Sequence, residues 1–363
     1  MSEVMFEQTV EQTVNMCSMQ AVDLKEERRF CSGMGFYFFV FFLISNGLQL
    51  LAGDLLMRFA PEIRQDNFGL YMILATAPMY VIGVPVLALQ CEGREAIKLP
   101  QRKMSAGKYM IFLMICFGVM IAGNITGIII NQIIGFIKGS PVINSVELLL
   151  NNNSLWANII IVGICAPIFE ELVFRKFLVD RMVRYGEATA VVVSGLIFGL
   201  FHGNFTQFFY AAALGMLFAF VYVTTGRLRY TILTHFIINM SSTLLVPVLQ
   251  KIDLEKLETF LTQITVLLEK NISPEMMASM IERKLHGMSD MFVSLIILLI
   301  YEMIIYGMSF AGIILLIMRR KHFVCNPGIE TIPKGKRASV IWFNVGMILC
   351  TIACLAMFVY MIL

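Results

Sequence analysis

Runs of hydrophobic residues, separated by short polar stretches, follow one another along most of the chain. Most runs are near the ~20 residues that a helix needs to cross the hydrocarbon core of a bilayer, and they lack the strict alternation of membrane-barrel strands. The fifth run is short. The pattern therefore predicts eight to nine membrane-spanning helices, at residues 34–57, 68–90, 108–137, 155–182, 188–203, 205–225, 230–250, 291–318 and 339–362.

The composition fits a protein that is surrounded by lipid. Of the 363 residues, 58% are hydrophobic and only 15% are charged, whereas about 25% are charged in an ordinary soluble domain. Backbone groups in hydrocarbon must be hydrogen-bonded within the protein, which helices achieve. We therefore predict an all-α, polytopic transmembrane helix bundle in contact with membrane lipid, and we expect no nucleic-acid partner. The eight cysteines form no CxxC pair, so neither a disulfide framework nor a zinc ribbon is indicated.

Basic residues lie unevenly on the two sides of this predicted bundle. Lys and Arg are enriched on the side that includes residues 25–29, 94–108, 175–184, 227–229 and 319–337. Because cytoplasmic loops carry an excess of Lys and Arg, we predict an integral, multi-pass protein with a cytoplasmic N-terminus. The first 30 residues are too polar for a cleavable signal peptide.

The predicted spans divide the chain into five parts. These are a cytoplasmic tail (1–32), N-terminal transmembrane helices (33–150), a core that carries the polar motifs (151–250), an insertion (251–290) and C-terminal transmembrane helices (291–363).

The insertion mixes acidic, basic and apolar residues at helical spacing. Its first half repeats leucine and isoleucine every three or four residues, and Ser273-Pro274 is typical of an N-cap followed by proline at the first helical position. We interpret residues 251–290 as an amphipathic helical hairpin on the outer membrane surface. It is either a covering loop or a docking site for a partner or substrate.

The most unusual polar residues of the core are Glu170 and Glu171, which lie in an apolar run together with Arg175. Ionisable groups in membrane segments are costly and are functional candidates by default. On a helix Glu171 and Arg175 are four residues apart and can pair, whereas Glu170 points about 100° away. One glutamate is therefore predicted to be paired and the other free.

Two further predicted spans carry a histidine. His202 ends the run that contains Phe198, and His235 shares a helix face with Asn239. Glu170 and His202 each lie roughly 20 Å along their helices from the turn at residues 185–186, but His235 lies only roughly 12 Å beyond Arg227. The sequence alone does not bring His235 to the same depth as the other two.

Glutamate and histidine side chains that meet in a cavity suit general acid–base chemistry. A carboxylate in a poorly solvated site becomes a competent base, able to take a proton from water as the water attacks a carbonyl. His235 and Asn239 can stabilise the resulting oxyanion. No competing Ser/His/Asp set is evident.

Three other functions are compatible with some of these residues. Glu170, His202 and His235 can supply the three protein ligands of a catalytic zinc, although the chain has no HExxH motif. A non-proteolytic scaffold or regulator of a signalling or peptide-immunity system can use the same helices to bind its partner. A proton-coupled transporter is disfavoured because no inverted repeat is visible.

The ordered motifs Glu170-Glu171-x-x-x-Arg175, Phe198-x-x-x-His202 and His235-x-x-x-Asn239 resemble those of the CPBP intramembrane endopeptidases. That family includes the type II CAAX prenyl endopeptidases and bacterial relatives linked to bacteriocin and peptide-pheromone processing or immunity. The resemblance covers about residues 150–250.

The resemblance implies a metal-independent glutamic peptidase without a cofactor, in a bacterial plasma membrane. By the family pattern, Glu170 activates water with help from His202, and His235 and Asn239 form the oxyanion hole. Glu171, Arg175 and Phe198 shape the site. The implied substrate is a membrane-associated or lipid-bearing peptide or protein.

Overall fold

The computed structural model describes residues 23–142, 150, 153–268, 273–330 and 332–363, and within these residues every regular element is helical. Most of the predicted tail (1–32) therefore lies outside the described residues. Positions 143–149 of the predicted N-terminal part (33–150) and positions 269–272 of the predicted insertion (251–290) lie outside them as well. The elements are α2 (Leu24–Phe59), α3 (Pro61–Asp66), α4 (Phe68–Pro78), η1 (Met79–Gly83), α5 (Val84–Glu92), α6 (Ala106–Lys138), α8 (Leu155–Asn158), η2 (Ile159–Cys165), α9 (Ala166–Glu171), η3 (Leu172–Val179), α10 (Asp180–Met182), η4 (Val183–Tyr185), α11 (Glu187–Phe201), α12 (Phe205–Thr225), α13 (Leu228–Thr243), α14 (Val246–Leu249), α15 (Leu254–Leu268), α16 (Pro274–His286), α17 (Ser289–Arg319), η5 (Arg320–His322), η6 (Lys334–Lys336), α18 (Arg337–Ile341) and α19 (Val345–Ile362).

Eight helices in the described part of the chain are long and apolar enough to cross a membrane, which confirms the predicted polytopic helix bundle. The fifth predicted span, 188–203, corresponds to α11, which has only 15 residues. At 1.5 Å per residue α11 is about 22 Å long, shorter than the ~30 Å hydrocarbon core. It is thus a short helix within the bundle.

The starts of two predicted spans lie well away from the helix starts in the structure. Helix α2 begins at Leu24, ten residues before the predicted span, because Asp23 caps it by accepting hydrogen bonds from the backbone N–H groups of Lys25 and Glu26. The last span begins at Val345 rather than at residue 339, where Asn344 caps α19. Capping side chains therefore set both starts.

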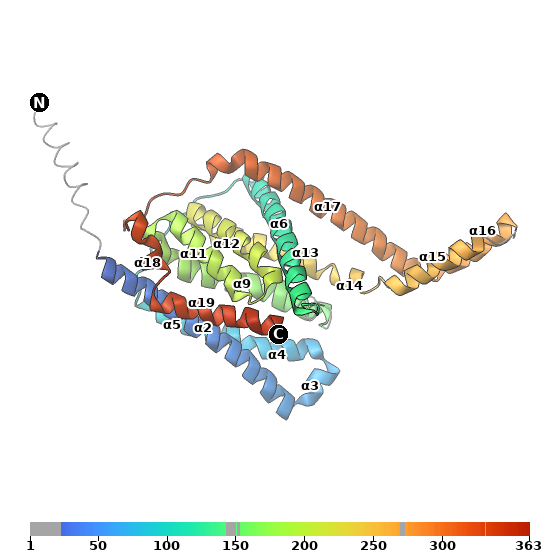
Figure 1. The fold of residues 1–363 in the computed structure, drawn as a ribbon, viewed down its shortest axis with the longest axis horizontal. Coiled ribbons are helices and arrows are strands. Elements are labelled where there is room, and N and C mark those ends of the chain that lie inside the picture. The colour runs from blue at the N-terminus through green and yellow to red at the C-terminus, as the bar shows by residue number, and fades with distance from the viewer. Residues whose placement is uncertain (1–22, 143–149, 151–152, 269–272, 331) are drawn as a thin grey trace, which may run out of the picture.

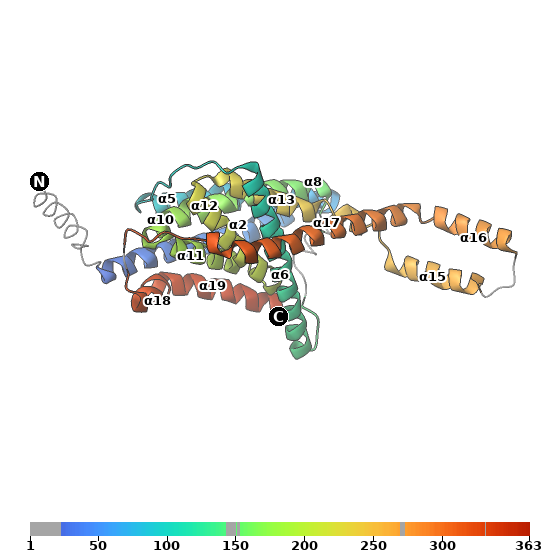
Figure 2. The ribbon, with the colours of Figure 1, turned by 90° about the horizontal axis from the view of Figure 1, so that it is seen from above.

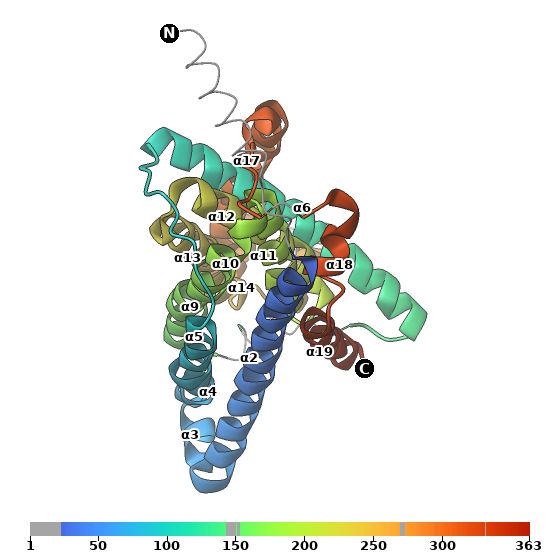
Figure 3. The same ribbon diagram turned by 90° about the vertical axis from the view of Figure 1, so that its left-hand side faces the viewer.

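The helices surround a central pair, α11 and α12, which pack closely against each other (Figure 1). Helices α2 and α19 pack together on one side, and α6 contacts α12 and α17 on the other. In Figure 3, α2 and the helix formed by α4, η1 and α5 make the two arms of a V that is closed by α3. The arrangement joins the N-terminal and C-terminal helices to the core between them.

Glycines allow α11 and α12 to approach so closely. A Cβ atom added to Gly199 would lie 2.9 Å from the carbonyl oxygen of Phe208, closer than real Cβ atoms come. Small residues are favoured at such contacts between membrane helices because they let the backbones meet. The close contact fixes the end of α11, where His202 follows.

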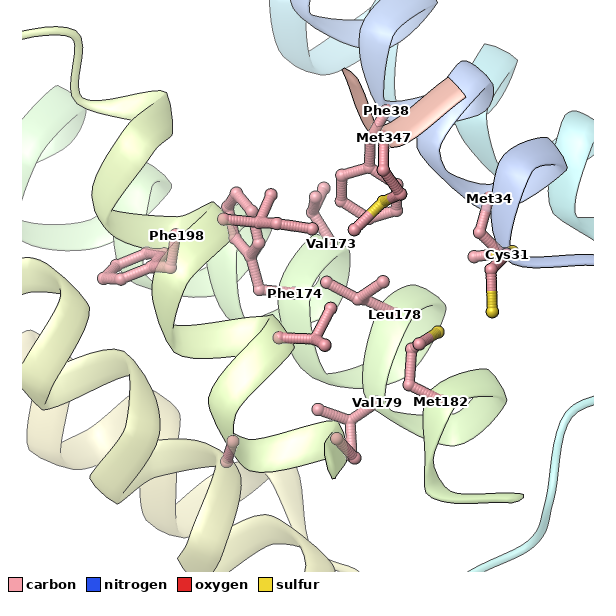
Figure 4. Packing of buried hydrophobic residues seen from close by; sticks show 14 of the residues in the cluster. Cys31, Met34, Phe38, Val173, Phe174, Leu178, Val179, Met182, Phe198 and Met347 are labelled. Atoms are coloured by element: carbon pink, nitrogen blue, oxygen red, sulfur yellow. The ribbon is translucent and has the colours of Figure 1, made fainter. Parts of the chain in front are cut away.

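Buried aromatic and aliphatic side chains fill the space between α2, η3, α11 and α19 (Figure 4). Phe38 of α2 is fully buried and contacts the ring of Phe174, which in turn meets Phe198 of α11 at 5.0 Å between ring centroids. Such interlocking packing holds side chains in single conformations. It supports the segment that carries the two glutamates.

The insertion forms two helices, α15 and α16, which lie beside each other and project beyond the bundle near the start of α17 (Figures 1 and 2). Ser273 caps α16 by accepting a hydrogen bond from the backbone N–H of Met276, with Pro274 at the first helical position. The predicted helical hairpin is present.

Candidate active site

The two glutamates end the short α-helical segment α9, which lies between the π-helical segments η2 and η3. A π-helical turn contains an extra residue, and such turns occur frequently at functional sites. Pro167 near the start of α9 lacks a backbone N–H and so helps to interrupt the regular hydrogen-bond ladder. The chain thus changes its helical register on both sides of Glu170-Glu171.

Glu171 and Arg175 form a two-pronged ion pair, as the sequence predicts. Arg175 Nε lies 2.9 Å from Glu171 Oε2, and Arg175 Nη2 lies 3.2 Å from Glu171 Oε1. The third guanidinium nitrogen of Arg175, Nη1, donates to Ser194 Oγ at 2.6 Å. The Ser194 hydroxyl in turn donates to the carbonyl oxygen of Phe174. Because a buried ion pair is stable only when its remaining polar groups are also satisfied, Ser194 belongs to the same structural unit.

Two aromatic rings enclose the guanidinium group of Arg175. Its central carbon lies 5.1 Å from the ring centroid of Phe198 and 5.7 Å from that of Phe218. These are cation–π distances, and the contact is strengthened where water is excluded. Phe198 therefore helps to hold the guanidinium group of Arg175 in place.

His235 lies between the two glutamates. Its Nδ1 is 3.3 Å from Glu171 Oε1, and its Nε2 is 3.8 Å from Glu170 Oε2. Since an ionised carboxylate can only accept, the Nδ1 hydrogen points to Glu171. In neutral His235 the Nε2 lone pair consequently faces Glu170, and in the imidazolium form Nε2 is a donor on that side.

His202 follows α11 and is fixed by backbone contacts. Its Nδ1 lies 2.8 Å from the carbonyl oxygen of Phe198, while its own carbonyl accepts from the side-chain amide of Asn204. A carbonyl oxygen accepts, so Nδ1 carries the hydrogen and Nε2 of the neutral ring is free to accept a proton.

Asn239 lies one turn beyond His235 on α13. One N–H of its side-chain amide donates to the carbonyl oxygen of Val162, 2.9 Å away in η2. The π-helical segment thereby anchors the amide and leaves its second N–H for another acceptor.

Two cavities meet at the candidate catalytic residues. The larger, about 450 Å³, is bordered by Glu170, His202, His235 and Asn239. The smaller, about 220 Å³, is bordered by Glu170 and His202 and extends between α2 and η1. Glu170 is 31% exposed, whereas Glu171 has no exposure. The predicted free glutamate is thus the one that reaches open space.

The described residues contain no cluster of three or more His, Cys, Asp or Glu side chains placed to hold a metal ion. Glu170, His202 and His235 border one cavity without forming such a set. The arrangement therefore offers a carboxylate, two imidazoles and an amide as its chemical groups.

Several residues at or beside the site were not identified from the sequence. Ser194 and Phe218 support Arg175, and Gln49 from the distant α2 borders both cavities. Ser194 carries the lone hydroxyl of an apolar run, and this could have marked it as a candidate partner for a buried polar group. No sequence pattern marks Gln49, because its approach to Glu170 depends on how the helices pack.

Comparison with known proteins agrees with the motif pattern. Residues 152–241 match the family described as "Type II CAAX prenyl endopeptidase Rce1-like", and that segment contains every candidate site residue named from the sequence. The chain is 28% identical over 179 residues to "Membrane-embedded CAAX protease MroQ" of Staphylococcus aureus, covering 47% of this chain and 68% of the relative.

A second relative is matched over a shorter stretch. The chain is 33% identical over 82 residues to "Putative membrane peptidase YdiL" of Bacillus subtilis, covering 22% of this chain and 34% of that protein. No solved structure matches the chain significantly.

Proposed function

We propose that this chain, whose residues 152–241 belong to the Rce1-like family of type II CAAX prenyl endopeptidases, hydrolyses a peptide bond with water that Glu170 activates. The observation that carries the proposal is the contrast between its two adjacent glutamates. Glu171 is fully engaged by Arg175, whereas Glu170 reaches both cavities. Only Glu170 is placed to meet a water molecule and a substrate.

In the proposed reaction Glu170 takes a proton from water while the water oxygen attacks the carbonyl carbon of the substrate. The carbonyl oxygen becomes an oxyanion in a tetrahedral intermediate. When the C–N bond breaks, the proton held by Glu170 passes to the leaving amine, so that a carboxylic acid and an amine result. No atom is required beyond those of water and substrate.

His202 assists this proton transfer. Its Nδ1 hydrogen is engaged by the Phe198 carbonyl, which leaves Nε2 as an acceptor beside the cavity. A histidine held in one tautomer can orient the attacking water or receive its proton. This role needs no direct bond between His202 and Glu170.

His235 and Asn239 stabilise the oxyanion. Asn239 has one N–H left after its bond to Val162, and His235 donates from Nε2 when it is protonated. His235 Nε2 lies 3.8 Å from Glu170 Oε2, on the side of the cavity where the oxyanion forms in the proposed reaction. Donors fixed in advance around a developing charge are worth more than mobile water.

The proposed substrate is a membrane-associated or lipid-bearing peptide or protein. Glu170, His235 and Asn239 lie on helices that qualify as membrane spans, so a substrate must reach them from the bilayer or its surface. One relative is named a membrane-embedded CAAX protease, which supports a substrate of this class. We further propose a glutamic mechanism that is independent of metal.

The experiment compares the membrane and secreted peptides of cells that produce wild-type protein or Glu170→Ala at equal abundance. Mass spectrometry should find peptide termini that disappear in the variant. Identical peptide profiles would contradict proteolysis and favour a scaffold function.

A second experiment tests the independence from metal. A chelator of zinc should leave turnover by the purified protein unchanged, and loss of activity that zinc restores would contradict metal independence.

A further inference from the structure

The smaller cavity, about 220 Å³, lies between the family-matched core and the N-terminal helices. One wall comes from Glu170 and His202, within residues 152–241, and the other from α2 and η1, which lie outside the matched segment. Nothing in the motif pattern assigns a role to those two helices. Their polar groups are the starting point of an inference that rests on the proposed peptidase function.

Helix α2 directs two polar side chains to this cavity, one turn apart. Ser45 is 5% exposed, and its hydroxyl oxygen is buried without a hydrogen-bond partner in the described structure. The side-chain amide of Gln49 has no hydrogen-bond partner among the described residues and borders both cavities. Asn46, between them, differs because its amide already donates to the carbonyl oxygen of Phe42.

The rest of the lining of the smaller cavity is mainly apolar. Tyr80 of η1 stacks on Phe169, with 4.5 Å between ring centroids, and both rings line the cavity. Phe41 and Phe42 of α2 and Val173, Phe174 and Phe201 of the core complete this apolar lining. The polar groups of α2 thus adjoin aromatic and aliphatic side chains, and Glu170 lies where the two cavities adjoin.

A polar edge of this kind suits a peptide backbone. A buried hydroxyl or amide costs free energy until it is hydrogen-bonded, and an extended peptide brings unpaired N–H and C=O groups that need partners inside a membrane protein. An amide side chain can pair with either group because it both donates and accepts. The cavity is also smaller than the ~300–1,000 Å³ of typical small-molecule sites, so it fits a short piece of chain.

We propose that Gln49 and Ser45 of α2 bind the backbone of an extended substrate segment that passes Glu170 from the larger cavity into the smaller one. Gln49, which borders both cavities, holds the peptide at the crossing point and sets the position of the scissile carbonyl. Gln49 and Ser45 are positioning residues. The N-terminal helices therefore complete a site whose chemistry lies in the core.

The test uses purified full-length protein in nanodiscs and a mixture of peptides made by digesting a proteome. Termini that form with wild-type protein but not with Glu170→Gln define cleaved sequences, from which one synthetic peptide is taken. Its backbone amides near the cleaved bond are replaced singly by esters. Each peptide is then measured with wild-type, Gln49→Met and Gln90→Met protein. Methionine keeps the length of glutamine but removes its amide, and Gln90 borders neither cavity.

Gln49→Met should lower kcat/KM about 3- to 10-fold, as expected for one lost hydrogen bond. One ester peptide should be cleaved with a kcat/KM about 3- to 10-fold lower than that of the all-amide peptide, both by wild-type and by Gln90→Met protein. Gln49→Met should cleave this ester peptide and the all-amide peptide equally well. Ser45→Ala should show a smaller loss. Equal ester effects in all three proteins, or unchanged kcat/KM in Gln49→Met, would overturn the positioning role while Glu170-dependent cleavage persists. A complete absence of Glu170-dependent termini would overturn the proposed function, and this inference with it.

Discussion

Arg175 and Glu171 form a two-pronged ion pair, with contacts of 2.9 and 3.2 Å, in which neither side chain has any exposure to solvent. Both partners also contact the residues around them: Arg175 bonds Ser194, and Glu171 bonds His235. The pair therefore links α11 and α13 to the segment that carries Glu170. Glu171 is therefore engaged by Arg175 and His235 beside Glu170.

Removing one member of this pair should strongly destabilise the protein. Arg175→Met leaves the Glu171 carboxylate buried without its cation, so the free energy of unfolding should fall by about 3–5 kcal/mol. Denaturant unfolding in mixed micelles measures the change. The double variant Glu171→Gln/Arg175→Met should recover part of the loss, because no uncompensated charge then remains.

The exposed pair Arg58–Asp54 provides a matched control. It has the same spacing and a contact of 2.8 Å, but its side chains are 69% and 50% exposed. Arg58→Met should cost no more than about 1 kcal/mol. Equal losses for Arg58→Met and Arg175→Met would show that burial does not govern the Glu171–Arg175 pair.

Loss of the Asn239 amide should affect turnover more than substrate binding. Asn239→Ala removes a proposed oxyanion donor, so kcat should fall about 10²- to 10³-fold with KM nearly unchanged. Steady-state kinetics on a cleaved peptide measure both constants. Ser241→Ala, on the same helix, should retain wild-type kcat, since Ser241 bonds the Ile238 carbonyl and the Tyr301 side chain and borders neither cavity. A rise in KM alone for Asn239→Ala would contradict the oxyanion role.

The positive-inside pattern predicts that residues 334–337 are cytoplasmic and that the hairpin α15–α16 is external. A cysteine in place of Ser279, which is exposed on α16, should react with a membrane-impermeant maleimide on intact cells. A cysteine in place of the exposed Lys336 should react only after lysis. The wild-type protein measures the background from native thiols. The reverse labelling pattern would contradict the predicted topology and show that the hairpin is cytoplasmic.

Much of this fold could be predicted because a bilayer requires long apolar helices, and such runs are visible in the sequence. The pairing of Glu171 with Arg175 was also predictable from their spacing of four residues and is confirmed. The short length of α11 and the starts of α2 and α19 were harder to predict from the sequence. They depend on capping side chains and on the turn around Gly186, which has a φ of +103°.

Local sequence patterns could not predict that the side chains of the site come together. Simple counting along the helices left His235 shallower than Glu170 and His202, yet His235 lies against both glutamates. The π-helical segments η2 and η3 alter the register around α9, and the sequence gives no simple signal for them. The approach of Gln49 from α2 depends in the same way on tertiary packing.

Turnover by Glu170→Gln tests most directly whether Glu170 activates the attacking water. Glutamine keeps the shape and hydrogen-bonding reach of the side chain but cannot take a proton. In purified protein that unfolds at the same temperature as wild type, kcat should fall by about 10²- to 10⁴-fold, the usual contribution of a general base. Turnover within tenfold of the wild-type value would contradict the mechanism.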